Sequence, residues 1–75
     1  MENKSFYYIT NWDDAAEYTR MLEALDIPHS VESPNENVVI HEGQLAIVFP
    51  EIFSYQYNDV RQLFGGEGIS YHTES

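Results

Sequence analysis

The sequence predicts a compact α+β domain with the element order β-α-β-β-β-α-β. Three observations predict it: short aromatic and aliphatic runs with strand character, two stretches with apolar residues at helical spacing, and Gly, Pro or Asn between them. Apolar residues make up 43% and aromatic residues 15% of the 75 residues, which distinguishes the chain from a disordered acidic segment. We therefore expect residues 1–75 to form a single acidic domain.

The first element is a strand, and a helix follows it directly. Residues 5–10 are aromatic and β-branched, which is typical of a strand. Asn11 is suited to cap a helix with Asp14 at its third position, so a helix is expected over 12–26, ended by Pro28. Its apolar face consists of Ala15, Tyr18, Met21, Leu22 and Leu25. The opposite face carries Asp13, Glu17, Arg20 and Ala24.

The middle of the chain predicts three extended runs separated by turns. A short segment over 28–33 comes first, and Val38–Ile40 follows a turn rich in Pro, Asn and Glu. After Gly43, residues 45–49 form the most apolar run of the chain. That run is expected to be a central strand.

A second helix and a last strand complete the predicted domain. The helix begins between residues 51 and 55, and both Pro50 at its first turn and Ser54 as its cap fit the pattern. Its expected buried face consists of Phe53, Tyr57, Val60 and Phe64. Gly65 and Gly66 end it, and a last strand is expected over 69–73.

This order contains the split βαβ arrangement of ferredoxin-like domains, with one additional short strand in the middle. We expect a ferredoxin-like sheet with both helices on one face. The other face, built from residues such as Tyr7, Ile9, Ser70 and His72, is expected to be solvated or to form an interface.

The strongest compositional feature is a formal net charge of −10 at neutral pH, because Lys4, Arg20 and Arg61 oppose thirteen acidic residues. A surface of one sign attracts partners of the other sign, so direct binding to nucleic acid or to an anionic membrane is not expected. The chain has no cysteine and no apolar run of roughly 20 residues, which favours a cytoplasmic protein. Its small size leaves homodimerisation open.

No pattern in the chain predicts catalysis. No serine lies in a nucleophile-elbow motif, and the glycines at 65–68 lack a lysine and follow a helix rather than precede one. A metal-dependent activity centred on His29 and His41 is a further hypothesis, but the two histidines do not have the sequence spacing of a known metal-binding motif. The sequence therefore favours a non-enzymatic protein with no catalytic residues, no metal and no cofactor.

The carboxylates and one tryptophan are the candidate contact residues. Asp13 and Glu17 share a helix face about 6 Å apart by helical rise, and Trp12 stands beside the acidic pair that opens the helix. The others lie near the middle turns or beside the second helix. The candidate partner-binding residues are Trp12, Asp13, Asp14, Glu17, Glu32, Glu36, Glu42, Asp59 and Glu67. A solvated surface that only confers solubility is the other interpretation.

Small size, absence of cysteine, extreme acidity and interleaved Tyr and Phe together resemble the DNA-mimic inhibitors of bacteriophages and mobile elements. The resemblance is one of character, without a shared motif. It implies a host-directed inhibitor whose carboxylates occupy the DNA-binding surface of a basic nucleic-acid-binding protein, such as a nucleoid protein, a sliding clamp or a nuclease. The alternative is a ferredoxin-like regulatory or ligand-binding module with incidental acidity.

Overall fold

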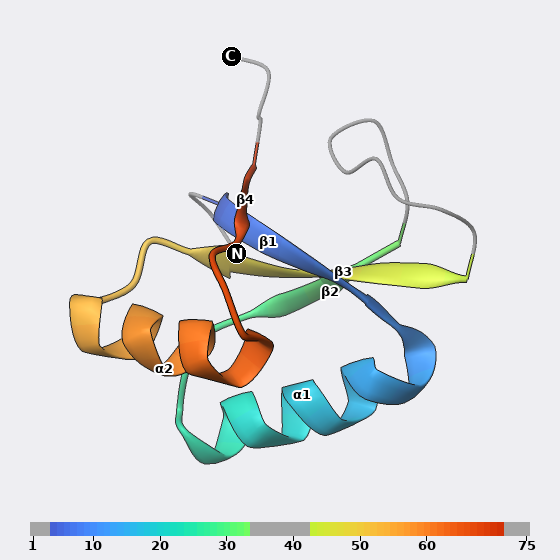
Figure 1. Ribbon diagram of the computed structural model, residues 1–75, viewed down its shortest axis with the longest axis horizontal. Helices are drawn as coiled ribbons and strands as arrows, with labels where there is room; N and C mark the ends of the chain where they lie inside the picture. Colours follow the sequence, from blue (N-terminus) through green and yellow to red (C-terminus); the bar gives the residue numbers. More distant parts are fainter. Residues whose placement is uncertain (1–3, 34–42, 72–75) are drawn as a thin grey trace.

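A computed structural model describes residues 4–33 and 43–71 of the chain (Figure 1). In these residues the domain contains four strands and two helices. They are β1 (Lys4–Asn11), α1 (Trp12–Ala24), β2 (Ser30–Glu32), β3 (Gln44–Pro50), α2 (Ser54–Phe64) and β4 (Ile69–Ser70). Neither helix in this part of the chain is long and apolar enough to cross a membrane.

The four strands form one antiparallel sheet in the order β2-β3-β1-β4. The prediction of a central apolar strand is confirmed, because β3 pairs with β1 on one side and with β2 on the other. In the register, Tyr8 lies opposite Ile47 and Tyr7 opposite Val48. The additional strand expected over 38–40 lies outside the described residues.

Helix α1 starts as the sequence predicted and ends two residues earlier. The Asn11 side chain accepts a hydrogen bond from the Asp14 backbone N–H at 2.8 Å and donates one to the Asp14 carboxylate at 3.1 Å. The helix ends at Ala24 because Asp26 adopts a left-handed conformation with φ of 58°. Pro28 therefore lies after the end of α1 and is not the residue that ends the helix.

Helix α2 begins at Ser54, so its N-cap is Phe53 rather than Ser54, and Pro50 ends β3 instead of lying in the first turn of the helix. The Gln56 side chain accepts a hydrogen bond from the Phe53 N–H at 3.1 Å, which satisfies one of the free donors at this end. Phe53 was expected on the buried face, and this is wrong, since its side chain is 69% exposed. At the other end Gly65 has φ of 81°, as the sequence predicted.

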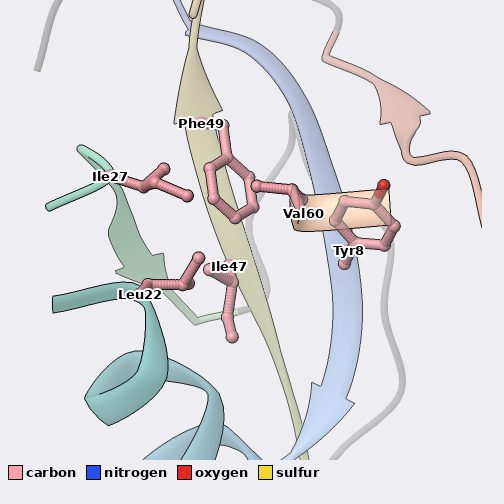
Figure 2. Close-up of a cluster of buried hydrophobic side chains, with 6 residues drawn as sticks. All are labelled: Tyr8, Leu22, Ile27, Ile47, Phe49 and Val60. Atoms are coloured by element: carbon pink, nitrogen blue, oxygen red, sulfur yellow. The ribbon is translucent and has the colours of Figure 1, made fainter. Parts of the chain in front are cut away.

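Both helices cover the same face of the sheet (Figure 1). A core of buried side chains joins the sheet residues Tyr8, Ile47 and Phe49 to one residue from each helix (Figure 2). These helix residues are Leu22 and Val60, which are fully buried. Burial of this apolar surface, together with the aromatic contacts around it, is the main source of stability expected for the fold.

The opposite face of the sheet is partly buried and partly exposed, and Ile9 on this face is 36% exposed, as the sequence predicted. Tyr7, Val48 and Tyr71 are buried there, and the rings of Tyr7 and Tyr71 meet edge to face at 6.0 Å between centroids. The expectation that Tyr7 would lie on a solvated or interface surface is therefore wrong. Ser70 was also placed on this face, but it pairs with Phe6 and lies on the helix side; His72 lies outside the described residues.

Candidate functional site

The exposed carboxylates are the dominant surface feature of the described residues. Nine of the thirteen acidic residues lie in the described ranges, and eight of them have exposed side chains. These eight are Asp13, Asp14, Glu17, Glu23, Asp26, Glu51, Asp59 and Glu67. Glu32 is the partly buried exception.

Very little positive charge offsets them. Lys4 forms an ion pair with Glu32, and hydrogen bonding to that carboxylate raises the pKa of the Lys4 ammonium. Arg61 lies over the ring of Tyr57 at 5.9 Å. Within residues 4–33 and 43–71, no carboxylate lies at ion-pair distance from Arg20 or Arg61. Apart from Asp14, whose carboxylate accepts a hydrogen bond from Asn11, the exposed carboxylates of the described residues are left to interact with solvent or with a partner.

The first turns of α1 bring together four of the predicted contact residues. Trp12, Asp13, Asp14 and Glu17 are all exposed. Asp14 is held by Asn11 as part of the helix cap. Asp13 and Glu17 lie one turn apart, about 6 Å along the axis, on the face that points away from the sheet. This end of α1 is the largest concentration of predicted site residues that the structure describes.

Glu32 has a different role from the one the sequence suggested. It was expected beside a turn with its carboxylate available to a partner, but it lies in β2 with its side chain only 14% exposed. Its carboxylate pairs with Lys4 and accepts a hydrogen bond from the Tyr71 hydroxyl at 3.1 Å. The structure therefore gives Glu32 an internal partner on the sheet face opposite the helices.

Asp59 lies in a groove between the two helices. The groove has a volume of about 480 Å³ and is lined by Met21, Ala24, Leu25, Asp59, Gln62 and Leu63. Met21 and Leu25 were expected on the buried face of α1, yet they are 40% and 49% exposed and form the rim of the groove. They are contact candidates that the sequence pattern assigned to the core.

Glu67 lies at a second hollow, near β4. This hollow measures about 390 Å³, and Glu51 and Glu67 both line it, together with Phe6, Ile52 and Tyr57. Glu51 was not among the predicted contact residues. The exposure of Glu51 could have been predicted from its position directly after Pro50, because Pro50 ends β3 and the chain leaves the sheet at the surface there.

The other predicted contact residues are not brought together with those at the start of α1 in the part of the chain that the structure describes. Glu36 and Glu42 lie outside the described residues. Asp59 on α2 and Glu67 before β4 border separate hollows rather than the start of α1. The acidic surface is thus distributed over several elements, with its densest part on α1.

The described residues offer little chemistry other than charge. In this part of the chain, no three His, Asp or Glu side chains are placed to hold a metal ion. The His29 Nδ1 donates a hydrogen bond to the Ile27 carbonyl at 2.9 Å, while His41, its suggested partner, lies outside the described residues. The chain matches no protein-family model, no curated protein and no solved structure.

Proposed function

We propose that this protein is a non-enzymatic DNA mimic, whose acidic surface binds and blocks the DNA-binding surface of a basic protein. A nucleoid protein, a sliding clamp or a nuclease has a surface of the required kind. One observation carries the proposal: eight described carboxylates are exposed, and neither exposed arginine pairs with any of them. A surface that only confers solubility gains by mixing charges of both signs.

The spacing of the carboxylates on α1 supports the same proposal. Asp13 and Glu17 are separated by about 6 Å along the helix axis. In duplex DNA each strand carries one phosphate per roughly 3.4 Å of axis. One carboxylate therefore corresponds to about two phosphates of a strand, and further charge comes from Asp14 beside them. A basic groove that holds DNA would meet a similar, if sparser, line of negative charge.

Electrostatic attraction sets the expected binding behaviour. The negative field speeds encounter with a positively charged surface, and salt weakens the complex because exposed charges are screened over about 8 Å at physiological ionic strength. DNA and the protein would compete for the same surface. Affinity is therefore expected to fall with salt, and added duplex DNA is expected to release the partner.

A pull-down from a bacterial lysate tests this proposal. The immobilised protein is incubated with the lysate at low and at high salt, and bound proteins are eluted with duplex DNA. We expect nucleic-acid-binding proteins to dominate the DNA eluate at low salt and to be lost at high salt. Capture of proteins that DNA does not displace would contradict the proposal.

The alternative function is that of a ferredoxin-like regulatory or ligand-binding module. The antiparallel strand order β2-β3-β1-β4 with two helices on one face supports this alternative, since a split βαβ pair has such an arrangement. Joint replacement of Asp13, Glu17 and Glu36 by their amides separates the two functions. A regulatory module would keep its partner or ligand, whereas a DNA mimic would lose much of its affinity.

A further inference from the structure

The groove between α1 and α2 offers a defined binding site in addition to the acidic surface. The two helices lie side by side under the sheet (Figure 1). Side chains of both helices line the groove. We propose that this α1–α2 groove receives a cationic amphipathic helix of the partner protein, with Met21 and Leu25 as apolar anchors and Asp59 as the ion-pair acceptor. The inference rests on the proposed function in one respect, that the partner is basic.

The apolar part of the groove is pre-formed and partly open to solvent. Met21 lies in the last turn of α1 and Leu25, four residues later, is its C-cap, so both side chains line the same side of the groove, and Leu63 of α2 lines the other side. Clustered exposed apolar side chains with polar residues at their edge mark sites of protein–protein interaction. Their burial by a partner would remove apolar surface from water at little cost in reorganisation.

Charge decides which partner fits. Asp59 is the single charged residue among the described residues that line the groove, and no described cation pairs with it. On α1, Glu17 lies one turn before Met21 and Arg20 lies one turn before Ala24, so these two charges offset each other and Asp59 supplies the net negative charge at the groove. A second copy of the chain would bring another −10 charge to this surface, which opposes self-association. A cationic partner segment gains attraction from the same charges.

The groove is bounded by one turn at the end of α1, from Met21 to Leu25, and by one turn of α2, from Asp59 to Leu63. A helix packed across these two turns can insert apolar side chains from its own adjacent turns. An amphipathic helix presents apolar side chains at i, i+3, i+4 and i+7, which is the pattern that fills a groove between two helices. Lysine or arginine at the edge of that apolar stripe would face Asp59.

Fluorescence anisotropy with a designed peptide tests the inference. The probe is a labelled Leu/Lys peptide of about 14 residues with an amphipathic helical pattern, and its control is a scrambled peptide of the same composition. We expect the protein to bind the amphipathic peptide about tenfold more tightly than the scrambled one. Replacement of Met21 and Leu25 by Gln should abolish this preference.

Two matched variants control for general effects. Ile69 and Val31 are each 46% exposed and lie in β4 and β2, away from the groove. Ile69→Gln and Val31→Gln should leave the preference for the amphipathic peptide unchanged. Asp59→Asn should weaken binding severalfold and reduce its dependence on salt. If the double variant is unfolded by circular dichroism, NMR shifts of the Met21 and Leu25 methyl groups in the unaltered protein give the same information.

Several results would overturn the inference. Equal affinity for the two peptides, retention of the preference in the double variant, or methyl shifts confined to other residues would each show that charge alone attracts the probe. A dimer of the protein that the peptide dissociates would identify a second copy as the occupant. The DNA-mimic proposal is tested separately by the lysate pull-down. It stands if duplex DNA releases the captured proteins and fails if DNA does not release them, and the result with the peptide does not affect that test.

Discussion

Removal of the Tyr71 hydroxyl tests whether Glu32 serves the fold rather than a partner. The hydroxyl donates to Glu32 across the sheet face opposite the helices, from the end of β4 at one edge to β2 at the other. Lys4 completes the contact by pairing with the same carboxylate. Tyr71→Phe keeps the ring that packs on Tyr7 and removes only the hydrogen bond.

The expected loss follows from the charge and exposure of the groups. A hydrogen bond to a charged group contributes about 1.5–3 kcal/mol when well shielded. Here the Glu32 side chain is 14% exposed and that of Lys4 is 31% exposed, so solvent screens part of the interaction. We therefore expect Tyr71→Phe to lower the free energy of unfolding by about 1 kcal/mol, or roughly 4–8 °C in melting temperature for a domain of this size.

Urea unfolding followed by circular dichroism measures the effect in a double-mutant cycle. Glu32→Gln should destabilise the protein by a similar amount, and the double variant should lose less than the sum of the two, because both changes remove the same contact. Glu17→Gln, which alters an exposed carboxylate on α1, is the control and should leave stability unchanged. Strict additivity, or a stable Glu32→Gln variant that captures less partner, would refute the structural role of Glu32.

Three further perturbations test the fold. Gly68→Ala should destabilise the domain by about 1–3 kcal/mol, because the added Cβ would lie 2.8 Å from the Phe6 ring, whereas Gly66→Ala meets nothing within 4 Å and should be tolerated in the same urea assay. Asn11→Ala should cost about 1 kcal/mol through loss of the α1 cap, and Asn11→Ser, which keeps an acceptor for the Asp14 N–H without adding a charge beside the Asp14 carboxylate, should restore most of it. Burial raises the pKa of the Tyr8 hydroxyl to about 12, so between about pH 10 and pH 12 Tyr8 is neutral in the folded state and ionised in the unfolded state. Stability is therefore expected to fall as pH rises from about 10 to about 12, and Tyr8→Phe should show a smaller decline in urea midpoint over that interval.

The sequence was sufficient wherever one local interaction determines the structure. Asn11 caps α1 because its side chain can reach the Asp14 N–H, and Gly65 ends α2 because it tolerates a positive φ. The apolar run 45–49 is central because its side chains need burial on both sides, and both neighbouring strands provide it. These features depend on few residues that are close in the sequence.

The sequence was insufficient where the tertiary arrangement decides exposure. Helical spacing placed Met21 and Leu25 on the apolar side of α1, but the position of α2 leaves them at the rim of a groove. Phe53 is the N-cap of α2 and lies outside the helix, although the apolar spacing placed it on the buried helix face. Glu32 has internal partners that lie 28 and 39 residues away in the chain, at Lys4 and Tyr71. No local pattern predicts such a contact.

The salt dependence of partner binding tests the central claim most directly. One protein captured from the lysate is titrated with the unaltered chain and with the Asp13→Asn, Glu17→Gln double variant over a range of salt concentrations. If the α1 carboxylates replace DNA phosphates, the affinity falls as the salt concentration rises, it falls less steeply for the variant, and duplex DNA displaces the chain. Equal slopes for the two proteins, with no displacement by DNA, would contradict the account.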